Sequence, residues 1–151
     1  MIYNEIKCNL FSVSTEYALV HCISADFALG AGIAVQFRNM GVKQELAEVY
    51  NDSTKYTSYA DEWNERRNGT CLLTTAGRTV YNLVTKERYF QKPTYDTLEQ
   101  SLRELKRIYA PQKIAMPKIG CGLDRLEWTE VRRIIKDVFG DTDTEILVCF
   151  V

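Results

Sequence analysis

Residues 116–126 read MPKIGCGLDRL, and this stretch decides how the whole chain is interpreted. An apolar run leads into Gly120 and Gly122, which flank one small residue, and the carboxylate of Asp124 follows closely. Glycine lets backbone N–H groups approach an anion, and it tolerates positive φ. The stretch therefore predicts a strand that ends in a turn able to bind an anion.

A second glycine-rich turn occurs at residues 28–34, which read ALGAGIA after an apolar run that ends near Ile23. We expect a helix to open near Ala31, with an N-terminus that favours phosphate. Neither turn is a GxxxxGK[ST] loop, and Val35 stands where GxGxxG needs its third glycine. Each turn alone is better explained as a chain reversal, but two at one sheet edge could hold a diphosphate between them.

Short apolar runs of strand length recur along the chain, as expected for the strands of a buried sheet. They cover residues 1–6, 17–23, 71–75, 80–85, 113–116 and 145–151. Residues 76–78 (AGR) separate two of these runs and predict a hairpin turn.

Helical spacing of apolar residues predicts two amphipathic helices, over residues 94–109 and 127–139. Thr94 can cap the first, and Gly140 can end the second. A further helix is expected to cover Ile33 to Phe37, and another residues 43–50. Strands that alternate with helices predict an α/β fold, a three-layer α/β/α sandwich around a mixed sheet that binds ligands at the carboxyl ends of its strands. We expect one domain over residues 1–151, with the polar residues 51–69 as a long loop, or a loop with a short helix, beside the ligand.

Composition narrows the classes of function. The chain has 19 basic and 20 acidic residues, a net charge of -1, so a broad nucleic-acid surface is not expected. No apolar run approaches the ~18 residues of a membrane span, and no secretion signal opens the chain, so we expect no membrane partner and a cytoplasmic location. The five cysteines form no CxxC pair and are expected to be free thiols. With a single histidine, no metal site and no cofactor are expected.

Five motifs in this order resemble macrodomains, and more narrowly the terminal ADP-ribose glycohydrolase branch, which includes relatives that strip ADP-ribose from DNA bases. They are HCIS (21–24), LGAGIAVQF (29–37), LVTK (83–86), KPTY (92–95) and MPKIGCGLDRLEW (116–128). The resemblance covers nearly the whole chain and is weakest at residues 51–69. It implies the macrodomain fold, with ADP-ribose or an ADP-ribosylated protein or nucleic acid as the partner.

The resemblance also implies the site residues. Lys86 would be the nucleophile and Asp124 the acid/base, a scheme that requires no metal. Asn9 stands where the family carries an aspartate that reads the adenine amino group. The glycines would offer backbone donors to phosphate, Ile33 and Leu123 apolar contacts to ribose, and Ser24 a hydroxyl. The ligand-binding residues that it implies are Asn9, Leu10, Ser24, Gly30, Gly32, Ile33, Thr85, Ile119, Gly120, Cys121, Gly122 and Leu123.

Structural interpretations compete with several of these roles. Lys86 could be a solvated residue at a strand end, and Asp124 could pair locally with Arg125. His21 is more consistent with a hydrogen-bonded core residue than with a general base. Cys121 has no base adjacent in sequence, which disfavours it as a nucleophile. The aromatic side chains of Tyr56, Tyr59, Tyr89 and Phe90 could stack on adenine or a base, although ordinary surface or core packing explains them better.

The predicted function is therefore the removal of a single ADP-ribose from an acidic side chain or a nucleobase by a monomeric enzyme. Two alternatives stay open: a non-catalytic module that binds ADP-ribose or a related signalling nucleotide, and a phosphatase acting on ADP-ribose 1″-phosphate.

Overall fold

The structure, a computed structural model, describes residues 1–50 and 67–151. Six strands form one sheet in the order β1-β6-β5-β2-β4-β3. Neighbouring strands run parallel except β3 and β4, which pair antiparallel as the predicted hairpin. The predicted mixed sheet is thus confirmed. The strands are β1 (Ile2–Lys7), β2 (Ala18–Ser24), β3 (Cys71–Thr74), β4 (Val80–Lys86), β5 (Lys113–Met116) and β6 (Glu145–Phe150).

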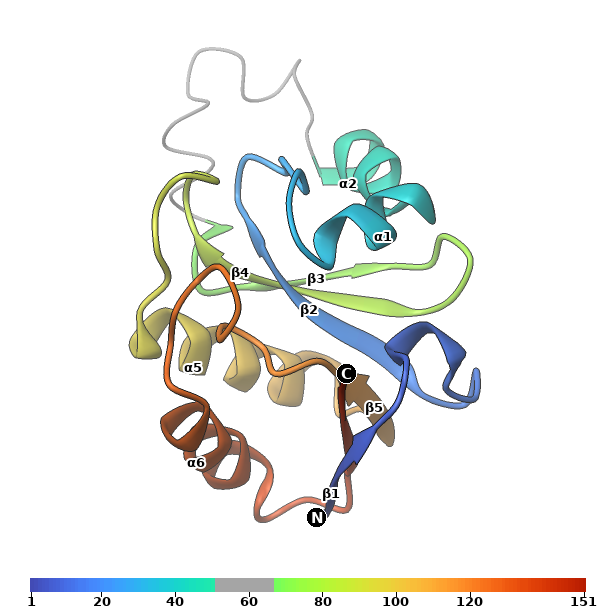
Figure 1. Cartoon of the computed structure of the whole chain (residues 1–151), viewed down its shortest axis with the longest axis vertical. Coiled ribbons are helices and arrows are strands. Elements are labelled where there is room, and N and C mark those ends of the chain that lie inside the picture. The colour runs from blue at the N-terminus through green and yellow to red at the C-terminus, as the bar shows by residue number, and fades with distance from the viewer. Residues whose placement is uncertain (51–66) are drawn as a thin grey trace.

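Helices cover both faces of this sheet, which confirms the three-layer sandwich (Figure 1). The helices α1 (Ala34–Asn39) and α2 (Val42–Tyr50) lie on one face. On the other face lie α5 (Tyr95–Glu104), the π-helical turn η3 (Leu105–Tyr109) and α6 (Trp128–Phe139). A short 3₁₀ turn, η1 (Leu10–Ser12), follows β1.

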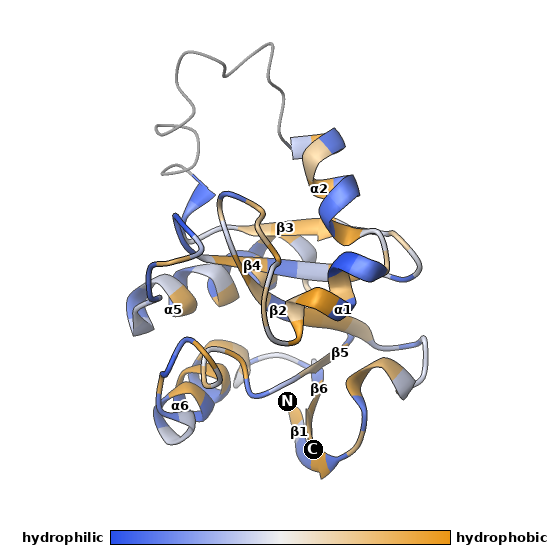
Figure 2. Ribbon diagram, turned by 45° about the horizontal axis from the view of Figure 1, so that its top comes forward, coloured by the Kyte–Doolittle hydropathy of each residue, from blue (hydrophilic) through white to orange (hydrophobic). Residues whose placement is uncertain are grey.

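The period-2 geometry of the strands divides the core into two clusters. In β2, Leu19 and Ile23 pack on the face covered by α1 and α2, whereas Val20 packs against α5 and α6. Figure 2 shows the resulting hydrophobic colouring along the strands and on the helix sides that face them. This two-sided burial explains why the strand reads as a continuous apolar run.

Two helix boundaries differ from the predictions. The first helix begins at Ala34 rather than near Ala31, because Leu29 (φ 43°) and Gly32 (φ 61°) have left-handed backbones that no α-helix contains. The predicted helix 94–109 begins as expected, with Thr94 accepting a hydrogen bond from the N–H of Thr97, but its last turn widens into η3.

The carboxyl ends of the parallel strands lie along one edge of the sheet in the order β1, β6, β5, β2, β4. The two glycine turns follow β5 and β2, and these two strands are direct neighbours. The ends of β1 and β4 are four strand spacings apart, roughly 19 Å. The topology therefore creates an elongated edge with both glycine turns in its middle.

His21 is a core residue, as predicted. Its ring is fully buried, stacks on Phe37 with centroids 3.8 Å apart, and shares a 2.6 Å hydrogen bond between Nε2 and Asn82 Oδ1. Burial lowers the pKa of His21 to about 4, and the hydrogen bond to Asn82 opposes this only in part. The ring is therefore neutral in the folded protein at pH 7.

This burial predicts a pH-dependent stability. The pKa of His21 is lower in the folded protein than in the unfolded chain, so protonation of the ring favours unfolding. The free energy of unfolding is therefore unaffected by protonation of His21 above about pH 6.5 and falls by up to about 3 kcal/mol as the pH drops toward 4. Urea unfolding of wild type and His21→Gln across pH 4.5–7.5 measures it. The free energy of unfolding of the wild type minus that of the variant should increase with pH over this range. A constant difference would contradict a buried, neutral His21.

Candidate active site

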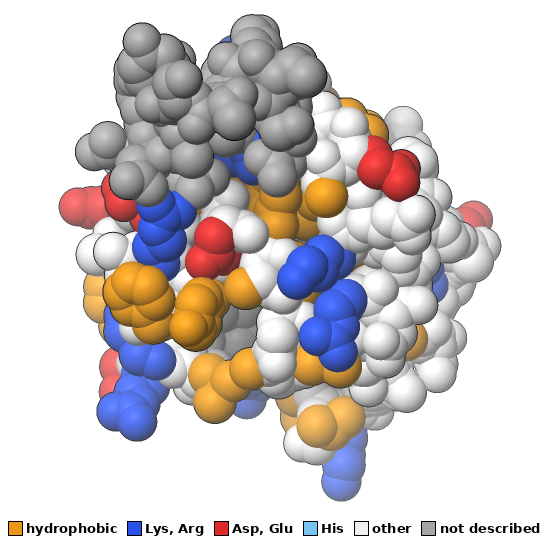
Figure 3. Space-filling view, turned by 90° about the horizontal axis from the view of Figure 1, so that it is seen from above, with side chains coloured by type: hydrophobic (Ala, Val, Ile, Leu, Met, Phe, Trp, Pro, Cys, Tyr) orange, Lys and Arg blue, Asp and Glu red, His pale blue; other side chains and the backbone are white. Residues whose placement is uncertain are grey.

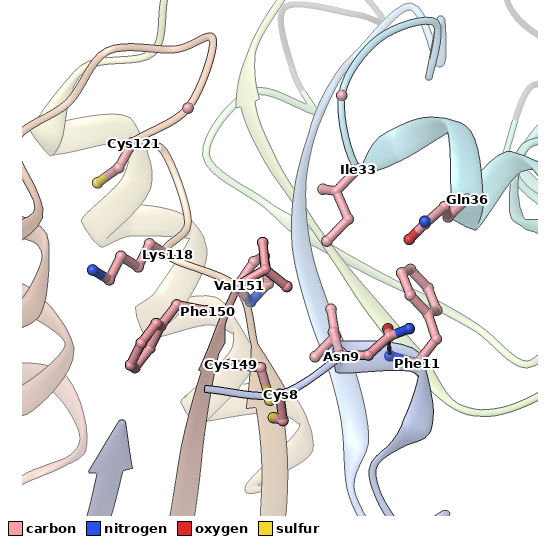
Figure 4. Close-up of a pocket in the computed structure, with 14 residues that line it drawn as sticks. Cys8, Asn9, Phe11, Ile33, Gln36, Lys118, Cys121, Cys149, Phe150 and Val151 are labelled. Carbon is pink, nitrogen blue, oxygen red and sulfur yellow. Dashed lines mark hydrogen bonds between the residues drawn. The ribbon is translucent and has the colours of Figure 1, made fainter. Parts of the chain in front are cut away.

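A cleft of about 610 Å³ lies at the carboxyl edge of the sheet. The first glycine turn contributes Gly32 and Ile33 to its lining, and the second contributes Cys121 and Gly122 (Figure 4). The turns approach each other closely, since a Cβ atom added to Gly32 would lie 3.5 Å from Leu123 Cδ1. The prediction that both turns meet at one edge is confirmed.

Lys86 and Asp124 form an ion pair close to the point where the two turns meet. Lys86 is the last residue of β4, and its Nζ donates to Asp124 Oδ1 at 2.8 Å. Only 15% and 17% of the two side chains are exposed. Lys86 is therefore not a freely solvated strand end, and the partner of Asp124 is a residue 38 positions away rather than its neighbour Arg125.

The half-buried thiol of Cys22 lies beside this pair. Burial, and after it the negative charge of Asp124, raise the pKa of Cys22. This thiol is therefore protonated at neutral pH and is not a second nucleophile.

The loop that carries Asp124 is closed by its own backbone. Gly120 has a φ of 73°, and the N–H of Leu126 donates back to its carbonyl at 2.8 Å. A Cβ atom on Gly120 would lie 2.9 Å from Leu126 Cδ1, so a side chain there would have to displace the end of the Leu126 side chain as well as adopt a left-handed backbone. The N–H of Arg125 closes a second turn on Gly122 O at 3.2 Å. The two hydrogen bonds join the residues before Asp124 to those after it, and so fix the backbone of Asp124.

The segment KPTY supports this loop from outside, which gives the motif a physical reason. Lys92 Nζ donates to the carbonyl of Leu123 at 2.7 Å, and Tyr95 Oη accepts from the N–H of Glu127 at 3.1 Å. The contacts fall on either side of Asp124. Lys92 and the first residue of α5, Tyr95, therefore hold the loop on both sides of Asp124.

Asp26 is a structural member of the site that sequence reasoning missed. Its carboxylate accepts from Ser24 Oγ at 2.5 Å, from the N–H of Ala28 at 3.2 Å and from the N–H of Tyr89 at 2.9 Å. It thereby ties the first glycine turn to the segment after Lys86. The available signal was an aspartate directly after a buried strand, where its side chain commonly accepts from backbone two residues on.

Three predicted ligand residues have side chains in the interior instead. Ser24, Thr85 and Ile119 are almost fully buried. The Ser24 hydroxyl is committed to Asp26, and Ile119 packs in the core beneath α5 and α6. None of the three is among the residues that line the cleft, so their part in ligand binding stays a prediction. Gly30 also lies outside the lining, in an exposed part of the first turn.

The end of the cleft below β1 combines predicted and unforeseen residues. Asn9 and Leu10 line it as predicted, and Asn9 Oδ1 accepts from the N–H of Phe11 at 2.9 Å. The lining residues that the sequence analysis missed are Cys8, Phe11, Gln36, Pro117, Lys118, Cys149, Phe150 and Val151. Most of them follow or end parallel strands, which is the signal that could have found them.

The remaining candidates have clear positions. Cys121 lines the cleft, but burial raises its pKa to about 11, which disfavours a thiolate nucleophile as expected. Tyr89 and Phe90 are exposed and stand at right angles with centroids 5.4 Å apart. Tyr56 and Tyr59 lie outside the described residues.

Within residues 1–50 and 67–151, no three histidine, cysteine or acidic side chains gather closely enough to hold a metal ion. Over the same residues, no helix combines the length and apolarity needed to cross a bilayer.

Solved structures show that this architecture is the macrodomain fold. The chain superposes on the macrodomain of Mycobacterium tuberculosis DarG with a TM-score of 0.73 at 19% identity, covering 98% of this chain and 97% of that one. For the macrodomain of Thermus aquaticus DarG the TM-score is 0.69 at 20% identity, covering 99% and 98%. Thermosipho africanus DarTG in complex with ADP-ribose gives 0.69 at 16% identity, covering 98% of this chain and 41% of that one.

Sequence comparison narrows the class. No protein-family model matches the chain. The chain is 40% identical to the ADP-ribose glycohydrolase OARD1 of Bos taurus and 38% identical to that of Homo sapiens, each over 147 residues that cover 95% of this chain and 88% of the relative. The chain therefore belongs to the ADP-ribose glycohydrolase OARD1 family.

Alanine substitutions at the two glycines of the second turn are expected to differ in their effect on stability. Gly120→Ala should lower the free energy of unfolding by about 1–2 kcal/mol, because it forces a side chain into a left-handed backbone and onto Leu126. Gly122→Ala is the matched control, since a Cβ there meets nothing within 4 Å, and its effect should stay within about 0.5 kcal/mol. Urea unfolding compares the two, and equal losses would show that the turn is not closed as described.

Proposed function

We propose that this chain is an ADP-ribose glycohydrolase that removes a single ADP-ribose from an acidic side chain or a nucleobase. The observation that carries the proposal is the Lys86–Asp124 pair, 2.8 Å apart beside a cleft formed by two glycine turns. The relatives named ADP-ribose glycohydrolase, and the ADP-ribose in a macrodomain-containing neighbour, support the same assignment.

Binding would use the two turns as a clamp on the diphosphate. Backbone N–H groups at Gly32 and Gly122 can approach phosphate oxygens closely, because no Cβ stands in the way. Ile33 and Leu123 are 37% and 63% exposed, so both offer apolar surface to a ribose. The distal ribose would then reach toward the end of β4.

The Lys86–Asp124 pair supplies both catalytic functions through one proton shift. Transfer from the ammonium to the carboxylate across 2.8 Å leaves a neutral amine and a carboxylic acid. The amine attacks C1″ of the distal ribose and the bond to the modified group breaks, with Asp124 giving its proton to the leaving group. The carboxylate then accepts the second amine proton and passes it to the ring oxygen O4″ as the C1″–O4″ bond breaks, which leaves a protonated Schiff base on Lys86. Water adds to this imine, the C1″–N bond breaks to free the amine, and the released ribose closes again to give ADP-ribose.

Replacing the proposed nucleophile tests the mechanism. Lys86→Ala should reduce ADP-ribose release by two orders of magnitude or more, about the range for losing a catalytic group, while ADP-ribose binding measured by calorimetry persists. The matched control is Lys106→Ala, which removes an exposed ion pair to Asp141 elsewhere on the surface and should leave turnover unchanged.

The same assays separate the alternatives. Undiminished release by Lys86→Ala with binding intact would rule out the lysine mechanism. Tight binding by the wild-type protein without any turnover would leave a non-catalytic ADP-ribose module. Phosphate release from ADP-ribose 1″-phosphate would instead indicate a phosphatase.

We also propose that the protein is cytoplasmic and monomeric. All five cysteines are free thiols, which suits a reducing compartment. The exposed large apolar side chains of the described residues are scattered over separate elements, including β1, α2 and the segment after β4. Figure 3 shows a face on which acidic and basic side chains are interspersed rather than gathered into one basic surface. Light scattering should give the mass of a single 17.4 kDa chain, and a dimer mass would overturn the monomer.

A further inference from the structure

The end of the cleft farthest from Lys86 has its own chemistry. It lies below β1, roughly 19 Å from the end of β4 by strand spacing. Figure 4 shows Asn9, Phe11 and Gln36 together on this side of the cleft. If the distal ribose lies at Lys86 and the diphosphate between the turns, as the proposed function requires, the base of the nucleotide reaches this end.

Asn9 is held in one orientation by the backbone. Its Oδ1 accepts from the N–H of Phe11 at 2.9 Å, which caps η1. The Phe11 ring is fixed in turn, edge-on against Phe37 with centroids 4.9 Å apart. The Asn9 amide nitrogen has no hydrogen-bond partner within residues 1–50 and 67–151, so its two N–H donors remain available to a ligand.

No acidic side chain among the described residues lines the cleft. The neutral carboxamides of Asn9 and Gln36 lie together at this end, whereas the cation of the lining, Lys118, lies on the side of Cys121 (Figure 4). A purine with an amino group at position 6 presents a donor there, and its best partner is a strong acceptor. A 6-oxopurine presents a carbonyl oxygen instead, which matches the free N–H donors of Asn9.

From this arrangement we infer that the base end of the cleft reads a 6-oxopurine, and that the protein binds inosine diphosphate ribose at least as tightly as ADP-ribose. Asn9 Nδ2 donates to O6 of hypoxanthine. The second lone pair of Asn9 Oδ1 still accepts from the adenine amine, so adenine is tolerated rather than excluded. Asn9 is thus the specificity-determining residue for the base.

Calorimetry with ADP-ribose and inosine diphosphate ribose tests this inference on the full chain. Wild type should bind the inosine compound at least as tightly. Asn9→Asp keeps an acceptor for the N–H of Phe11, so the turn still forms, but it replaces the donors with a carboxylate. The ratio of the two dissociation constants should shift toward ADP-ribose by about tenfold or more.

The control variant is Asn4→Asp, which makes the same charge change on β1 outside the cleft lining and should leave the ratio unchanged. Repulsion between the new carboxylate and the diphosphate weakens both ligands alike, so it cancels in the ratio. Tighter wild-type binding of ADP-ribose than of inosine diphosphate ribose, or a ratio that Asn9→Asp does not move, overturns the inference. Either result leaves the proposed glycohydrolase activity standing as long as the protein releases ADP-ribose from a substrate. If the protein binds neither ligand, both proposals are overturned.

Discussion

The site depends on one topological constraint: β5 and β2 are parallel neighbours in the sheet, and each is followed by a glycine turn. Parallel neighbours end at the same edge, so the turns meet although they lie about ninety residues apart in sequence. Because Gly32 carries no side chain, Leu123 can approach it closely. A cleft between bare backbone segments follows directly from that adjacency.

The ion pair of Lys86 and Asp124 is the chemical consequence of the same geometry. The end of β4 supplies the amine, and the loop after β5 supplies the carboxylate. Lys92 holds that loop through the Leu123 carbonyl, and Asp26 holds the opposite turn to the segment after β4. These contacts come from different parts of the chain, so the relative position of amine and carboxylate is fixed by the folded domain.

Apolar periodicity was enough to predict the six strands and the layers, because burial on both faces leaves continuous hydrophobic runs. The pairing of Lys86 with Asp124 could be predicted only from the motif resemblance, since the two residues lie 38 positions apart in the sequence. The sequence could not reveal that the Ser24 hydroxyl donates a hydrogen bond to Asp26, or that Asn9 Oδ1 accepts one from the N–H of Phe11. Those hydrogen bonds depend on backbone turns, and Leu29 adopts a left-handed conformation that its residue type does not suggest.

Reductive trapping tests the central claim most directly. If Lys86 forms a Schiff base with the opened ribose, borohydride added during turnover reduces the imine to a stable amine that carries ADP-ribose. Peptide mass spectrometry should then locate the adduct on Lys86, and Lys86→Ala should yield none. Rapid turnover without an adduct on Lys86, or the same adduct on another lysine, would contradict the account.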